Sequence, residues 1–404
     1  MQPGIVHDLS PEQAVRLHAR AFPFQSLPAT SKDNIDIPQI PGRYFSRSIC
    51  FNRFSSPRFE CSENYDAMMQ KSNDVTMRKV LPFFALTIGV GLAVWLVIAA
   101  NFTAVVHSFA QIGWGIAAII LVRAVMIMMN GVAWGELLAT STNAPFVVFP
   151  LLRWVREAID VLLPVGSIGG SLVCARLLTF WRVSSTIAVA GVVVDVFLQT
   201  VAQIMFAGIG ALLLTKNAGL SAVLTEFILG LAVAVIAVSG FYIALRYGGT
   251  RLIDRLLKYL SQRIALQTRE DEPSFQTAIN GIWQGRGRYV GAALFTHLFA
   301  WMIGTLEVWL TLHFMEWPIS LQQAIVFESL GASISTAAFL VPGSWGVQEG
   351  GYILIGQILR VPAYLSLTLS LVKRIPDLLL GAPGLLVWRV IEARHLFSPD
   401  LQAN

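Results

Sequence analysis

Charged side chains inside apolar stretches are the residues of this chain best placed to do chemistry. An ionisable group at membrane depth costs free energy, and it therefore marks a functional site by default. Glu349 is suited to three roles: a proton site, a counter-ion for a substrate amine, or an ion-pair partner of Arg374. The adjacent cations Lys373 and Arg374 could bind a lipid phosphate, or they could extend to the membrane interface. Arg123 and Asp195 are a candidate ion pair between helices.

Asp160 and Arg176 are the charged candidates of the first half of the chain. Asp160 follows Arg156 and Glu157 at spacings that place the three side chains on neighbouring faces of one helix. We expect these three to neutralise one another. Arg176 ends the same interrupted segment, and we expect it at the depth of the lipid headgroups.

Two proline–glycine interruptions break the apolar stretches in corresponding places of the two halves. Proline stops a helix, and glycine permits a tight reversal and the close approach of a ligand. The outgoing half-helices would turn free N–H groups toward the membrane midplane, where they suit an anionic or hydrogen-bond-accepting group. A purely structural turn is the alternative. The candidate substrate-binding residues are Asp160, Pro164, Gly169, Gly170, Arg176, Pro342, Gly343, Gly346, Glu349, Lys373 and Arg374.

The composition predicts an all-α polytopic membrane protein. Of the 404 residues 55% are hydrophobic and 13% are charged, against roughly 25% charged residues in soluble domains. The net charge of +5 reflects basic cytoplasmic loops, and no nucleic-acid partner is expected. The three cysteines and six histidines show no metal-ligand spacing, so we predict neither metal nor cofactor.

The apolar runs predict the order and orientation of the elements. Full spans are expected at about 80–100, 112–138, 184–214, 219–245, 288–314 and 362–390, with broken segments at 146–180 and 321–358. The stretch from Asn101 to Ile112 is expected to be an uncharged loop. Basic residues cluster on one side, which predicts cytoplasmic N- and C-termini.

The parity of these spans predicts two inverted repeats. Each repeat would hold about three transmembrane helices and one re-entrant hairpin made from a broken helix; the alternative makes each broken segment two full spans. The repeats cover about 80–214 and 219–392, with a cytoplasmic amphipathic loop at 246–287. Residues 1–79 are predicted to be disordered or a spurious upstream extension, and 393–404 a short cytoplasmic tail.

A family resemblance rests on the second interruption. The stretch from Pro342 to Glu349, PGSWGVQE, resembles the Pro-Gly-x-x-Gly-x-x-Glu motif of the lysylphosphatidylglycerol-synthase transmembrane-region (flippase-like) family. The resemblance covers about residues 80–392. Similarity to a hopanoid-biosynthesis-associated subgroup rests on Leu162–Pro164, Ile168–Gly170, Ala175–Leu178, Ser370–Arg374 and Gly384–Trp388.

The resemblance implies a multi-pass protein of the bacterial inner membrane that moves hopanoids or related lipids between leaflets or toward the outer membrane. Two positions depart from the pattern. Asp160 stands where the family tends to have Asn, and Ser171 stands where it tends to have an acid, which argues against proton coupling by the first hairpin. We expect no soluble aminoacyl-transferase domain, and therefore no lysyl-lipid synthesis.

Three other functions stay open on the sequence. One is transport of a phospholipid or polyisoprenyl phosphate, whose charge would suit the half-helix N-termini. Another is an intramembrane lipid-modifying enzyme with Glu349 and Asp160 as acid and base, although no catalytic motif is present. The third is a scaffold for lipid-biosynthesis enzymes; these enzymes, or further copies of the chain, are the protein partners considered.

Overall fold

A computed structural model describes residues 102–163, 166–218, 222–247, 272–284, 286–338, 341 and 344–397, together with residue 87 and parts of 91–99. The chain divides into two units, Met1–Ala67 and Met68–Asn404, and all described residues belong to the second. The boundary predicted near residue 79 lies outside these ranges, as does most of the 246–287 loop.

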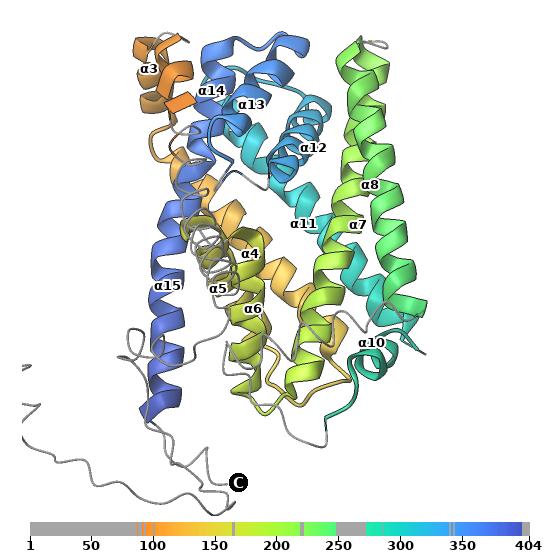
Figure 1. Cartoon of the computed structure of the whole chain (residues 1–404). Coiled ribbons are helices and arrows are strands. Elements are labelled where there is room, and N and C mark those ends of the chain that lie inside the picture. The colour runs from red at the N-terminus through yellow and green to blue at the C-terminus, as the bar shows by residue number, and fades with distance from the viewer. Residues whose placement is uncertain are drawn as a thin grey trace, which may run out of the picture. The chain divides into compact units, whose positions relative to one another are not determined.

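The regular elements of these ranges are all α helices (Figure 1). In chain order they are α3 (Phe102–Ile112), α4 (Gly115–Leu138), α5 (Val148–Leu162), α6 (Gly166–Thr179), α7 (Ser185–Ala218), α8 (Ala222–Tyr247), α10 (Phe275–Trp283), α11 (Gly287–Phe314), α12 (Leu321–Ala337), α13 (Val347–Ile358), α14 (Ala363–Val372) and α15 (Arg374–Phe397). The all-α prediction is confirmed for this part of the chain.

Helices α4, α7, α8 and α11 are long and apolar enough to cross a membrane. They correspond to the spans predicted at 112–138, 184–214, 219–245 and 288–314. Helix α8 has only 6% of its most apolar window buried, so it lies at the outside of the helix bundle. The first predicted span, 80–100, lies largely outside the described residues. The protein is therefore a membrane protein, and every regular element in its described part is a helix.

The prediction of an uncharged loop at 101–112 is wrong, because helix α3 occupies nearly all of this segment. The buried residues of α3 are Val105, Ser108 and Ile112, which recur at the spacing of one helix face. That face packs against α14. Helix α3 therefore depends on a partner about 260 residues away in sequence, which the local pattern did not reveal.

Four short helices form the two interrupted segments. Helices α5, α6, α12 and α13 have 15, 14, 17 and 12 residues, fewer than the roughly 20 that a full span requires. The pair α5–α6 lies in the lower half of Figure 1, and the pair α12–α13 lies in the upper half. Pro164, Pro342 and Gly343 lie outside the described residues. Gly346 has a φ of 78°, a left-handed conformation that glycine adopts without strain.

A third break was missed in the segment predicted as one span, 362–390. Helix α14 ends at Val372, and α15 begins at Arg374. Pro376 explains this position, because a proline ring clashes with the carbonyl group four residues earlier and cannot donate the helical hydrogen bond. The break leaves Lys373 between the two helices.

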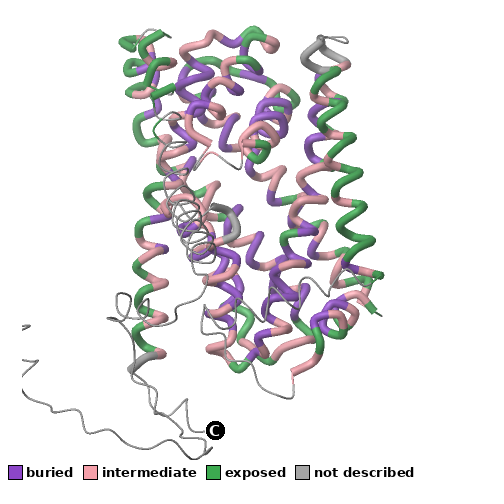
Figure 2. The backbone as a smooth tube through the Cα atoms, in the orientation of Figure 1, coloured by how far each residue is buried: buried purple, intermediate pink, exposed green. Residues whose placement is uncertain are grey.

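The helices pack across the two halves of the chain. Helix α4 lies against α11, α5 packs against α15, and α12 packs against α7. Buried residues are concentrated where the short helices meet α4, α7 and α11, whereas α8 and α15 expose one side along much of their length (Figure 2). Small residues allow close contact: a Cβ atom added to Gly131 of α4 would lie 2.3 Å from the Cα atom of Pro150 in α5.

Candidate functional site: two buried charge clusters

Lys373 is the centre of a buried charge cluster in the second half of the chain. Its Nζ atom lies 2.9 Å from Oε2 of Glu307 and 2.7 Å from Oε2 of Glu328. The guanidinium of Arg123 lies 3.0 Å from Oε1 of Glu307 and 3.7 Å from Oδ1 of Asp377. We call these five residues the Lys373 cluster; they come from α4, α11, α12, the α14–α15 break and α15.

The centre of the Lys373 cluster is buried, whereas the side chains of Arg123 and Asp377 at its edge are 14% and 22% exposed. The side chain of Glu307 is fully buried, and that of Lys373 is 8% exposed. Removing such charges from water costs several kcal/mol per ion, and short contacts with opposite charges offset that cost. The five residues comprise two cations and three carboxylic acids, so the cluster can hold one proton when its charges balance.

Glu349 closes the turn that begins the second outgoing helix. Its Oε2 atom accepts a hydrogen bond of 2.6 Å from the backbone N–H of Gly346, which caps α13. Its Oε1 atom accepts one of 2.8 Å from Nε of Arg374. The guanidinium of Arg374 also lies 3.9 Å from the centre of the Trp345 ring. Of the three roles that the sequence left open for Glu349, the structure displays the ion pair with Arg374.

Gln348 joins the same turn to its neighbours. Its amide Nε2 donates to Oγ of Ser370 in α14, 3.2 Å away. Its Oε1 atom accepts from Oγ of Ser335 in α12, 3.4 Å away. Gln348 was not predicted as a site residue, although an amide beside a helix break in an apolar stretch is a recognisable signal for such cross-links; its side chain is half-buried.

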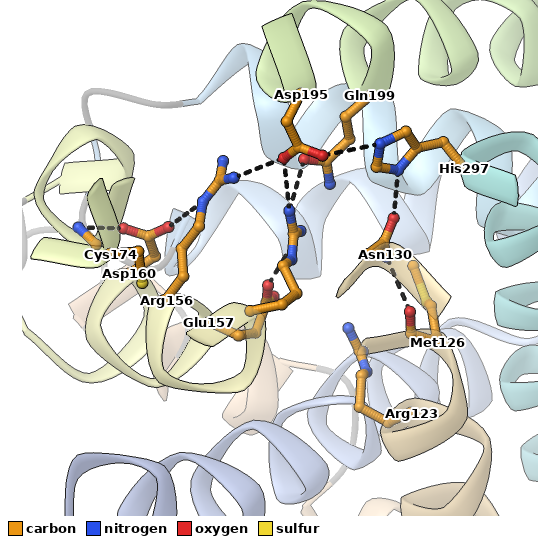
Figure 3. A network of polar contacts seen from close by, with 12 residues as sticks. Arg123, Met126, Asn130, Arg156, Glu157, Asp160, Cys174, Asp195, Gln199 and His297 are labelled. Atoms are coloured by element: carbon orange, nitrogen blue, oxygen red, sulfur yellow. Dashed lines mark hydrogen bonds and ion pairs between the residues drawn. The ribbon is translucent and has the colours of Figure 1, made fainter. Parts of the chain in front are cut away.

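Asp195 is the centre of a second buried cluster, in the first half of the chain (Figure 3). Its Oδ2 atom lies 3.0 Å from Nη1 of Arg156 and 3.7 Å from Nη1 of Arg153. Its Oδ1 atom lies 3.1 Å from Nε2 of His297. We call Asn130, Arg153, Arg156, Asp195 and His297 the Asp195 cluster; it joins α4, α5, α7 and α11. The two arginines explain why a carboxylate is tolerated on α7 at this depth.

Both ring nitrogens of His297 have a hydrogen-bonding partner. Asn130 donates its Nδ2 to the carbonyl of Met126 at 2.9 Å, so its Oδ1 atom is the one 2.7 Å from Nδ1 of His297. Nδ1 must therefore carry a proton. Nε2 faces the carboxyl of Asp195. His297 thus connects Asn130 of α4 to Asp195 of α7; it was not predicted as a site residue because histidines were considered only as metal ligands.

The remaining candidates of the first half occupy two separate places. Asp160 accepts a hydrogen bond from the backbone N–H of Gly170 at 2.9 Å and lies 3.6 Å from Nε of Arg156, so it ties α5 to α6 at the edge of the Asp195 cluster. A Cβ atom at position 170 would lie 2.5 Å from Oδ1 of Asp160, which explains the glycine. Arg176 instead pairs with Glu392 of α15.

The structure groups the candidate residues differently from the expected arrangement. Glu349, Gly346 and Arg374 lie together, and Asp160 lies with Gly170. The candidate ion pair of Arg123 and Asp195 does not form: the Arg123 guanidinium is matched by Glu307, and the Asp195 carboxyl by Arg156. The reason is that the two residues belong to different clusters, each with nearer partners of opposite charge.

Comparison with known families places this arrangement in context. The family model described as the lysylphosphatidylglycerol synthase TM region matches residues 83–384. Both charge clusters and the Glu349–Arg374 pair fall within that range. No curated protein and no solved structure matches the chain. Since the matched range is well over half of the 404 residues, the chain belongs to the lysylphosphatidylglycerol synthase TM region family.

Proposed function

We propose that this protein transports a lipid between the leaflets of the bacterial inner membrane, and that hopanoids or related lipids are its cargo. Membership of its family links the protein to lipid handling. The observation that carries the proposal is that a buried charge cluster lies beside each of the two interrupted segments. Such clusters are costly in a membrane, and they mark ion and substrate pathways.

The packing supports two inverted repeats with re-entrant hairpins. The first-half hairpin packs through α5 against the second-half helix α15, and the second-half hairpin packs through α12 against the first-half helix α7. Each of these two contacts borders a cavity of similar size. One, of about 370 Å³, lies between α7, α8 and α12, and the other, of about 390 Å³, lies between α4, α5 and α15. Reciprocal packing of this kind is expected where two oppositely oriented repeats enclose a central site.

Two ion pairs connect the second hairpin to the break between α14 and α15, and these contacts would open and close during transport. Glu349 and Glu328 belong to the second hairpin, and their partners Arg374 and Lys373 belong to the break between α14 and α15. Movement of the hairpin would separate these charges, and closure would reunite them. Alternating access then amounts to exchange between two packed states, with Glu349, Arg374 and Arg176 as polar contacts on the path.

The paired charges favour an uncharged cargo over a phosphate. Arg374, Lys373 and Arg176 each face a carboxylate within the protein. A lipid phosphate would have to displace that carboxylate and leave it buried without a cation, which costs several kcal/mol. An uncharged headgroup does not compete for either member of a pair, so the pairs that open with the hairpin can form again when it closes.

A vesicle assay tests the proposal. The purified protein is placed in liposomes that contain a fluorescent hydroxylated triterpenoid, phospholipid or polyisoprenyl phosphate, and a membrane-impermeant reductant is added. We expect the inner-leaflet triterpenoid to become accessible with the wild type but not with Glu349→Gln. The exposed acid Glu316, changed to Gln, serves as the matched control and should transport normally.

Two outcomes would overturn the proposal. If the wild type leaves the inner-leaflet pool of every lipid as protected as in empty vesicles, the protein does not translocate lipids. If extraction and mass spectrometry instead show a chemically altered lipid only in vesicles that contain protein, the lipid-modifying enzyme replaces the transporter.

A further inference from the structure

The cavity between α7, α8 and α12 has the size and composition of a lipid-binding site. Its volume is about 370 Å³, within the range of roughly 300–1,000 Å³ that is usual for small-molecule sites. Most of its wall is apolar, including Phe227, Leu231 and Ile334. One wall is α8, which runs beside α7 (Figure 1) and has only 6% of its most apolar window buried, so the cavity borders a largely exposed apolar helix.

The polar groups of the wall are almost all hydrogen-bond acceptors. Thr200 uses its hydroxyl hydrogen on the carbonyl of Val196 at 2.8 Å. Ser333 uses its own on the carbonyl of Ser329 at 2.7 Å. Because each hydroxyl hydrogen is already used, both hydroxyl oxygens can act toward a ligand only as hydrogen-bond acceptors.

Gln203 shows the same bias. Its Nε2 atom donates to the carbonyl of Ala332 at 3.3 Å and to Oγ1 of Thr336 at 2.6 Å. An amide nitrogen has two hydrogens, so both are used, and Oε1 is the group that can serve a ligand. Thr336 accepts from Gln203 and keeps its own hydroxyl hydrogen as a donor.

The charge of the cavity wall also favours a ligand that donates hydrogen bonds. Among the described residues that line the cavity, the one ionisable side chain is Glu226, and neither lysine nor arginine is present. Glu226 is exposed on α8, and among the described residues no ion pair occupies its carboxylate, which can therefore face a ligand. A phosphate has only acceptors to offer and would be repelled by Glu226, whereas a hydroxyl or an ammonium would satisfy the acceptors.

We propose that this cavity binds a lipid whose polar end donates hydrogen bonds, through hydroxyl or ammonium groups, and carries no phosphate. Gln203 Oε1, Thr200 Oγ1 and Ser333 Oγ receive the donated hydrogens, and the apolar wall covers the first part of the hydrocarbon. This assignment rests on the proposed transport function for its role, but the binding site itself can be examined without any transport measurement.

Photolabelling of the full-length protein in nanodiscs provides the test. The probes are a monoacylglycerol, a long-chain alkylamine and a lysophosphatidate, each with a diazirine in the acyl or alkyl chain, and labelled peptides are mapped by mass spectrometry. We expect the first two probes to label α7, α8 and α12, and the lysophosphatidate to label them about tenfold less at equal concentration. Loss of alkylamine labelling in Glu226→Gln, with monoacylglycerol labelling retained, would identify the ammonium as the group that Glu226 binds.

Two variants connect the labelling to the acceptors. Gln203→Leu should reduce monoacylglycerol labelling about tenfold, whereas Gln322→Leu, an exposed glutamine at the far end of α12, should leave it unchanged. Thr336→Lys adds a cation to the wall and should raise lysophosphatidate labelling above that of the wild type. This gain cannot arise from misfolding.

The inference is overturned if lysophosphatidate labels the cavity as strongly as the other probes, or if no probe labels these three helices. Its failure is distinguishable from that of the proposed function. Vesicles that translocate lipid while the cavity remains unlabelled retain the function and remove this site. Labelling without translocation retains the site and removes the function.

Discussion

Glu349 and Arg374 are joined by a short ion pair, with Oε1 of Glu349 2.7 Å from Nη2 and 2.8 Å from Nε of the guanidinium. The Glu349 side chain is fully buried and that of Arg374 is 11% exposed. The pair connects the start of α13 to the start of α15. It therefore joins the turn between α12 and α13 to the break between α14 and α15. Both breaks therefore share one electrostatic connection.

Neutralising only one member of the Glu349–Arg374 pair should reduce the free energy of unfolding more than neutralising both members. Glu349→Gln leaves the guanidinium buried without its carboxylate, and we expect a loss of about 3 kcal/mol in the free energy of unfolding. The double variant Glu349→Gln/Arg374→Gln should recover at least half of that loss, because no lone charge remains. Thermal unfolding of the singles and the double in detergent measures the coupling. Simple addition of the two single effects would show that the pair is not energetically coupled.

Lys373→Met should be among the most destabilising single changes in the protein. It leaves Glu307 and Glu328 facing each other without the ammonium between them, and the expected loss is about 3–5 kcal/mol. Combining it with Glu328→Gln should restore most of the lost stability, since Glu307 keeps Arg123.

The exposed Arg360 provides the matched control for Lys373, because it is also a cation in the second half. Arg360→Met should change the unfolding free energy by no more than about 0.5 kcal/mol. Equal effects of Lys373→Met and Arg360→Met would contradict the role assigned to the Lys373 cluster.

Two glycines of the helix bundle should respond oppositely to alanine. At Gly131 the new methyl group would lie 2.3 Å from the backbone of Pro150, so α4 and α5 must separate, at a cost of about 1–3 kcal/mol. At Gly240 no atom lies within 4 Å of the added Cβ, and alanine should be neutral or stabilise α8 by up to about 1 kcal/mol. Unfolding temperatures of the two variants, compared with the wild type, measure the difference. A stable Gly131→Ala protein would mean that α4 and α5 are not in this close contact.

Glu272 is expected to make stability depend on pH from outside the membrane spans. Its carboxylate accepts hydrogen bonds from the backbone N–H groups of Ser185 and Thr186, 2.9 and 3.1 Å away, and from both hydroxyls, and so it caps α7. Partial burial alone would raise the pKa of Glu272, but these hydrogen bonds outweigh burial and hold the pKa below its ordinary value of 4.5. The ionised form is therefore favoured in the folded state.

The direction of the pH effect follows from that lowered pKa. The contribution of Glu272 is present above the ordinary glutamate pKa and is lost as the pH falls through the lower folded value. The wild type should therefore unfold at a higher temperature than Glu272→Gln near neutral pH, and the gap should narrow as the pH falls below about 4.5. The control Glu316→Gln should give no such trend; a gap that widens on acidification would contradict the capping role.

Local features of the sequence were sufficient to locate most elements and the two interruptions. The apolar runs at 112–138, 184–214, 219–245 and 288–314 became α4, α7, α8 and α11, because the length of an apolar run directly reflects the thickness of a bilayer. Proline and glycine marked the breaks because their effect on the backbone acts within one helical turn. The sequence also singled out Glu349, Lys373 and Arg374 as charges within apolar segments, and left open whether the two cations extend to the interface; the structure leaves their side chains only 8% and 11% exposed.

Tertiary structure decided which charges meet. Arg123 pairs with Glu307, 184 residues away, and His297 meets Asp195, 102 residues away. Such partners depend on how each helix is rotated and how closely its neighbours approach, and neither quantity is contained in hydropathy or spacing. Helix α3 and the cavity between α7, α8 and α12 were likewise absent from the sequence analysis, because both exist only through packing between distant segments. The sequence alone determined the four long apolar helices and two of the three helix breaks, since both follow from short-range chemistry; the fold alone determined the third break's position between buried charges and the partners of each charge, since those follow from long-range packing.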